Sequence, residues 1–293
     1  MLSKFIKMNK IFYVAGFSLV VGLSSCGDSH ADEMKDTHDS IVADVAPKDT
    51  TPITVNEDTK FKFDFAIANI PSPVSSVNEL SSWGVPYNSA FLIDTKSHSA
   101  ADEFGKGLQL GAFNIDMSYA MVNNVDEDVL KYMKAVLIKS DALGLKSAVD
   151  QMVGKRAEKN IANKDSLLRI LDEIFVKSDS YLRTNERVYT ASAVFAGSWV
   201  EALYLTCKIA EAGTEPAVKE KGNKQLWDQR FYLKNLSDLL NDYKDKKECV
   251  ALNDKLKVIL NEITLIKDPK DFKEANFKSI SEKIYALRAS IIK

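Results

Sequence analysis

From Phe61 to Lys293, apolar residues recur with the 3.6-residue period of an α-helix, and no stretch of useful length alternates as a strand would. Short breaks between long periodic stretches favour antiparallel neighbours. We therefore predict an all-α fold, a single bundle of about eight to ten antiparallel helices. The expected helices span residues 62–69, 73–83, 98–123, 126–142, 145–158, 164–183, 186–212, 223–243, 247–266 and 271–291.

Two features of this pattern qualify the prediction. Pro216 is expected to prevent a helix from continuing, so no helix is expected between residues 212 and 223. Helix pairs recur at intervals of about 40 residues, which makes a tetratricopeptide-like stack of helical hairpins the alternative fold. The tryptophan, glycine and tyrosine positions of that repeat do not recur in register, so the bundle is preferred.

Two of the expected helices have the composition of central ones. The segment from Phe104 to Val122 carries two apolar stripes, which indicates a helix covered on both sides. The segment from Val188 to Cys207 has a single charged residue, Glu201, and several polar ones, which favours a buried helix over a membrane span. Small residues in both segments should allow close packing: Gly105, Gly107 and Gly111 in the first, and Ala193, Ala196 and Gly197 in the second.

Glu201 is the most informative single residue, because an acid in a buried helix must be paired, hydrogen-bonded or protonated. We expect a structural partner such as Arg, Lys or Tyr, with a polar anchor for a ligand between helices as the alternative. Asp116 lies between the two stripes of its helix and would meet Glu201 if the two helices are neighbours. The candidate ligand-binding residues are therefore Asp116, Tyr119, Trp199 and Glu201.

Motifs for known catalytic chemistry are missing. The sequence has no P-loop, no G-x-S-x-G pattern and no E-x-x-H motif. Of its three histidines, His98 alone lies beyond residue 60, which leaves little for a zinc site or a Ser/His/Asp set. No metal, cofactor or catalytic residue is predicted. Cys207 and Cys249 either form a disulfide or remain two buried thiols, and separate helical segments favour thiols.

The N-terminal residues have the plan of a signal peptide, with three lysines before an apolar run that is too short to cross a bilayer comfortably. Either Met1 or Met8 would serve as the start. The run ends in Leu23-Ser24-Ser25-Cys26, which resembles the lipobox of bacterial lipoproteins. The resemblance implies that residues 1–25 are removed and that Cys26 is attached to lipid, which would anchor the chain stably through two or three acyl chains.

The segment from Gly27 to Lys60 has nine acidic residues against three lysines and almost no large apolar side chain. Such a composition cannot bury enough surface to offset the entropy of ordering, so residues 26–60 are predicted to be a lipidated cysteine followed by a disordered acidic tether. Gly27 is not the aspartate of inner-membrane retention, and the acids beyond it resemble the surface-export signals of Bacteroidota lipoproteins. The outer membrane is therefore expected, facing either the periplasm or the cell surface.

The resemblance extends into the folded part. The segments FAIANIPSP (65–73), GLQLGAFNIDMSYA (107–120), NKDSLLRILDE (163–173) and AGSWVEALYL (196–205) are similar to uncharacterised all-helical lipoproteins of Bacteroidota. The similarity implies a fold and a location but no activity.

The charge of the chain excludes one class of partner. Its formal net charge is −2, and the excess of acids lies before residue 61. A nearly neutral helical domain argues against a nucleic-acid partner, which requires a basic patch. We expect a non-catalytic envelope module, attached to the membrane by lipid, that binds a protein or a small molecule. The alternative is an envelope enzyme or metal-dependent protein that uses buried carboxylates in a central cavity.

Overall fold

Helices α3 (Glu103–Val122) and α7 (Val188–Ala212) form the centre of the fold and pack against each other more extensively than any other pair of described helices. The computed structural model describes residues 63–64, 73–97, 100–145 and 187–292, together with positions 156, 159, 166 and 182. The predicted helices at 62–69, 145–158 and 164–183, His98, the signal peptide, Cys26 and the tether lie wholly or largely outside these residues.

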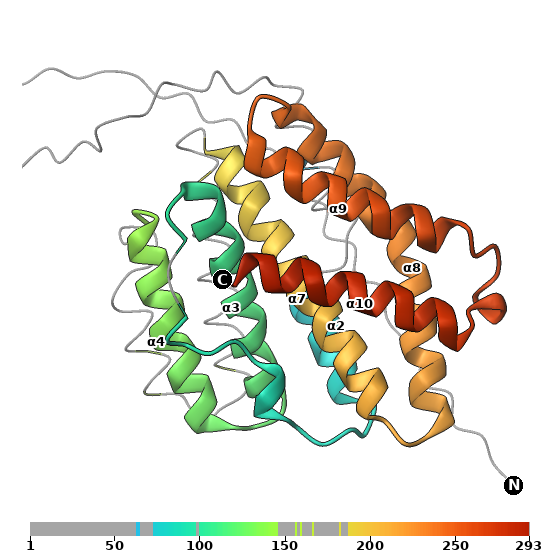
Figure 1. Cartoon of the computed structure of the whole chain (residues 1–293). Coiled ribbons are helices and arrows are strands. Elements are labelled where there is room, and N and C mark those ends of the chain that lie inside the picture. Colours follow the sequence, from blue (N-terminus) through green and yellow to red (C-terminus); the bar gives the residue numbers. More distant parts are fainter. Residues whose placement is uncertain are drawn as a thin grey trace, which may run out of the picture. The chain divides into compact units, whose positions relative to one another are not determined.

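Every regular element in the described ranges is helical, which confirms the all-α prediction (Figure 1). The other α-helices are α2 (Pro73–Ser81), α4 (Asp126–Ala142), α8 (Pro216–Leu240), α9 (Lys247–Thr264) and α10 (Glu274–Ile291). Short 3₁₀ helices η1 (Ser89–Phe91), η2 (Asn241–Tyr243) and η3 (Pro269–Asp271) lie in the connections. Seven α-helices therefore account for the described part of a bundle expected to hold eight to ten.

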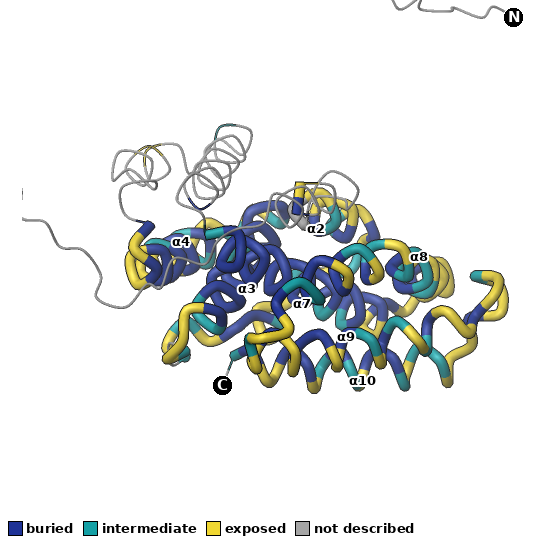
Figure 2. Tube along the Cα trace, turned by 90° about the horizontal axis from the view of Figure 1, so that it is seen from above, coloured by how far each residue is buried: buried dark blue, intermediate teal, exposed yellow. Residues whose placement is uncertain are grey.

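The packing partners distinguish a bundle from a stack of hairpins. Helix α3 contacts α2, α4, α7, α9 and α10, and α7 contacts α2, α3, α8 and α10. In a solenoid each repeat contacts only its neighbours, whereas here α10 packs on helices that precede it by many residues. Figure 2 shows the result, with buried positions concentrated along α3 and α7 and exposed positions on the outer helices.

The close approach of α3 and α7 depends on glycine. A Cβ atom added to Gly111 would lie 2.0 Å from the Val194 carbonyl oxygen, and one added to Gly197 would lie 2.0 Å from the Leu108 carbonyl oxygen. The backbones of α3 and α7 are thus in direct contact at both glycines, as the small residues predicted. Gly105 does not contribute to this contact, because it lies in the first turn of α3, where its N–H donates to the Asp102 side chain at 2.7 Å.

Two helix starts differ from the prediction by five residues or more. Helix α3 begins at residue 103 rather than 98, because Asp102 caps its N-terminus. Helix α8 begins at Pro216 rather than at 223, because proline is accommodated in the first turn, where its missing N–H would have no partner inside the helix. Gly222 then falls inside α8, where an added Cβ would lie 2.5 Å from the Ala210 Cβ atom of α7. The long break expected between residues 212 and 223 is therefore a short connection, residues 213–215, between α7 and α8.

The apolar run of α7 is buried in the bundle, as predicted. All but four of its 25 residues are buried, and the exceptions lie near its C-terminal end. Within the described ranges, no helix has both the length and the apolarity that a bilayer crossing requires.

Candidate functional site

Glu201 is fully buried in the middle of α7, and its partner is an arginine from α10. The Arg288 guanidinium donates from Nε to Glu201 Oε2 at 3.0 Å and from Nη2 to Glu201 Oε1 at 2.9 Å. A two-point pair of this kind fixes the orientation of both groups and is among the stronger hydrogen-bonded arrangements. The expectation of a structural partner for Glu201 is fulfilled by a residue 87 positions away in the chain.

Asp116 joins this pair from α3. Its side chain is fully buried, its Oδ2 accepts a hydrogen bond from the Ile93 N–H at 2.8 Å, and its carboxyl group lies within hydrogen-bonding reach of Glu201. Because α3 and α7 are neighbours, the two acids meet as the sequence analysis allowed. Asp116, Glu201 and Arg288 form what we call the core charge cluster.

The protonation of the core charge cluster follows from burial. Burial raises the pKa of Asp116 well above its ordinary value, and the nearby charge of Glu201 raises it further. Burial also raises the pKa of Glu201, but the guanidinium of Arg288 and a hydrogen bond from Asp116 oppose that rise. The pKa of each acid is thus raised, and both acids retain a proton more readily than free carboxyl groups do. One proton held between the two acids would make the cluster neutral beside Arg288.

Groups around the cluster hold it in place. Arg288 Nη2 also donates to the Phe91 carbonyl oxygen at 3.2 Å, and its guanidinium carbon lies 4.0 Å from the centre of the Tyr204 ring. The Tyr132 hydroxyl of α4 donates to the Ile93 carbonyl oxygen at 2.6 Å. With the bond from Ile93 to Asp116, these contacts tie the segment around η1 to α3, α4 and α10, so the cluster holds these elements together.

The other two candidate residues are buried, but their contacts lie elsewhere. The Trp199 indole N–H donates to Gln229 Oε1 of α8 at 3.1 Å. Tyr119 stacks on Tyr87, with ring centres 5.0 Å apart. The structure therefore brings Asp116 and Glu201 together, whereas Trp199 faces α8 and Tyr119 faces the loop that follows α2.

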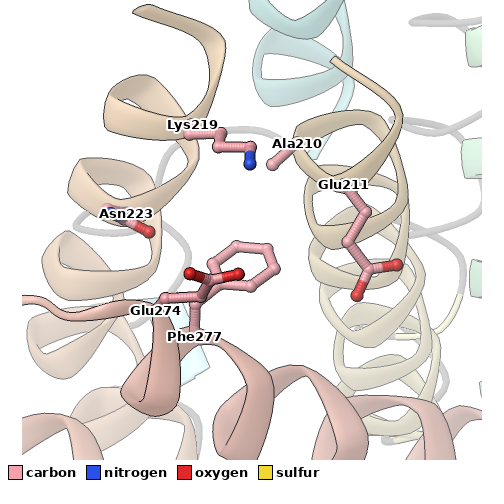
Figure 3. A pocket seen from close by; sticks show the side chains of 6 residues that line it. All are labelled: Ala210, Glu211, Lys219, Asn223, Glu274 and Phe277. Atoms are coloured by element: carbon pink, nitrogen blue, oxygen red, sulfur yellow. The ribbon is translucent and has the colours of Figure 1, made fainter. Parts of the chain in front are cut away.

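An open pocket lies away from the core charge cluster, between the C-terminal end of α7 and the N-terminal ends of α8 and α10 (Figure 3). Its volume is about 250 Å³, and its walls are formed by Ala210, Glu211, Lys219, Asn223, Glu274 and Phe277. The sequence did not predict this pocket. The spacing of Lys219 and Asn223, and of Glu274 and Phe277, places each pair on one helix face, but no sequence signal indicates that those faces meet.

Neither cysteine forms a disulfide. Cys207 and Cys249 are buried free thiols, which settles the two alternatives in favour of thiols. Burial raises the pKa of Cys249 to about 12, so this thiol is a poor nucleophile at neutral pH. In the described residues, no three His, Cys, Asp or Glu side chains are grouped so that they could hold a metal ion.

Comparison of the chain with family models, with curated proteins and with solved structures finds no match.

Proposed function

We propose that this chain is a lipoprotein of the outer membrane whose helical domain binds a ligand without catalysing its conversion. The observation that carries the proposal is Leu23-Ser24-Ser25-Cys26 at the end of a short apolar run. Lipid on Cys26 would hold the chain at the membrane, facing the periplasm or the cell surface. The acidic segment that follows would act as the tether of the folded part.

The state of the two buried acids supports binding rather than catalysis. A general acid or base must come within hydrogen-bonding reach of the substrate. Asp116 and Glu201 are each 0 % exposed; Asp116 accepts a hydrogen bond from Ile93, Glu201 accepts from Arg288, and the two carboxyl groups lie close enough to affect each other's pKa. An enzyme that used these carboxylates would have to break the cluster before each reaction, so a concave surface elsewhere is the better basis for function.

Replacing Cys26 by serine tests the anchor. Cells that express Cys26→Ser in the full chain should incorporate no alkyne-tagged fatty acid into it, because serine lacks the thiol that is alkylated. The protein should then leave the membrane fraction. Labelling is measured by coupling a fluorophore to the alkyne after gel separation.

Cys249→Ser is the matched control, because it removes a buried thiol of the folded part. It should keep the label at an equal amount of protein. Label that persists in Cys26→Ser, or a membrane fraction that is unchanged by it, would refute the lipoprotein assignment.

A further inference from the structure

The pocket between α7, α8 and α10 presents two opposite charges that have no ion-pair partner in the part of the chain that the structure describes. Lys219 comes from the first turns of α8 and Glu274 from the first turn of α10. Figure 3 shows the Lys219 ammonium and the Glu274 carboxylate turned toward the middle of the pocket. Among the described residues, neither has an ion-pair partner within 4.0 Å. The two charges therefore face each other across space that a ligand can enter.

Several other charges on these helices, including the third charge on the pocket wall, are paired within the described part of the chain. On α8, Lys224 pairs with Asp228 at 2.7 Å, and Lys234 pairs with Asp238 at 2.6 Å. Glu211, a third charge on the pocket wall, pairs with Lys208 at 3.3 Å. The pocket thus offers one free cation and one free anion from the described residues.

The remaining walls supply a polar acceptor and an apolar surface. The Asn223 side-chain nitrogen points to the Phe272 carbonyl oxygen at 3.5 Å, which leaves the amide oxygen to accept a hydrogen bond. The Phe277 ring and the Ala210 methyl group are the apolar part of the lining. A volume of about 250 Å³ lies below the roughly 300–1,000 Å³ of pockets for drug-sized ligands, so the ligand has few heavy atoms.

We propose that this pocket binds a free α-amino acid with an apolar side chain. Its carboxylate would pair with Lys219, its ammonium group would pair with Glu274 and donate to the Asn223 amide oxygen, and its side chain would lie on Phe277. This inference rests on the proposed function as a binding module and gives that module its ligand class.

Binding of L-leucine to the full lipidated chain in detergent tests the proposal by isothermal titration calorimetry. L-leucinamide lacks the carboxylate and 4-methylpentanoate lacks the ammonium group, so each should bind at least about tenfold more weakly, since each loses one charged hydrogen bond. Glycine keeps both charges and lacks the apolar side chain, and it should also bind more weakly.

Substitutions in the pocket provide the second arm. Lys219→Gln and Glu274→Gln should each weaken leucine binding by about tenfold or more. Lys221→Gln on α8 and Glu282→Gln on α10 are matched controls, because both side chains are exposed and neither lines the pocket. These controls should change the affinity by less than about twofold.

The outcomes separate this inference from the proposed function. Absence of saturable leucine binding, equal affinity for all four compounds, or full affinity in Lys219→Gln and Glu274→Gln would each overturn the ligand assignment. Lipidation of Cys26 is measured independently, so a lipidated chain that fails to bind leucine would leave the anchor proposal standing. A chain that binds leucine but carries no lipid would support the pocket and refute the anchor.

Discussion

The core charge cluster and the pocket each place a cation near a carboxylate, but in opposite situations. In the cluster, Glu201 and Arg288 are joined by a two-point ion pair and are buried. In the pocket, Glu274 and Lys219 are exposed and have no ion-pair partner among the described residues. Burial makes the first pair essential, because an unpaired charge inside a protein is costly. The second pair is exposed, so leaving its two charges apart costs little free energy, because water solvates both groups. Charges that a fold encloses therefore stabilise architecture, and charges that it leaves facing each other across a pocket remain available to a ligand.

The largest expected effect comes from removing the cation of the cluster. Arg288→Met keeps much of the side-chain volume but leaves the Glu201 carboxylate buried without its partner. The free energy of unfolding should fall by about 3–5 kcal/mol, measured by urea denaturation. Lys221→Met, an exposed position on α8, should stay within about 0.5 kcal/mol of the parent protein. A loss below about 1 kcal/mol in Arg288→Met would show that the ion pair of the cluster does not stabilise the fold.

A smaller effect, with a distinct pH dependence, is expected for Asp116→Asn. An asparagine amide can donate to Glu201 as a protonated Asp116 does, so the substitution should cost less than about 1.5 kcal/mol at pH 5. Because the pKa of Asp116 is raised in the folded state, the folded protein retains a proton that the unfolded chain releases above about pH 3.9. Stability supplied by this proton is full below that pH and is lost as the pH rises toward the folded pKa.

Asp116→Asn removes this titration, so its stability relative to the parent protein should improve between pH 5 and pH 8. The limiting slope is about 1.4 kcal/mol per pH unit. Urea denaturation of both proteins at several pH values measures the difference. A constant difference across that range would mean that Asp116 carries no proton in the folded state.

The smallest effect is expected in the pocket. Lys219→Gln should change the free energy of unfolding by no more than about 0.5 kcal/mol, and in the stabilising direction, because a cation near the N-terminus of α8 opposes the helix dipole. Glu274→Gln should destabilise by about 0.3–1 kcal/mol, because an acid in the first turn of α10 favours that dipole. Thermal unfolding measures both, and a loss above about 2 kcal/mol in either variant would assign that residue to the architecture.

The sequence predicted those parts of this molecule that depend on local pattern. The two apolar stripes of 104–122 and the long apolar run of 188–207 identified α3 and α7 as the central helices, and a lone acid in that run required a partner. Arg288 as that partner was beyond reach, because it is fixed by the packing of α10 across α7 rather than by spacing along the chain. The start of α8 at Pro216 was missed because proline both ends and begins helices. The pocket was missed because it exists only where three helix ends meet.

The separation of Glu201 from Arg288 also has a consequence for biosynthesis. A ribosome adds about 5–20 residues per second, and 87 residues separate the acid from its cation. Glu201 is therefore translated about 4–17 seconds before the side chain that compensates it, and Asp116 earlier still. During that interval the nascent chain lacks Arg288, the cation that pairs with Glu201 between α3 and α7. The core of the bundle therefore cannot form completely until α10 has been translated.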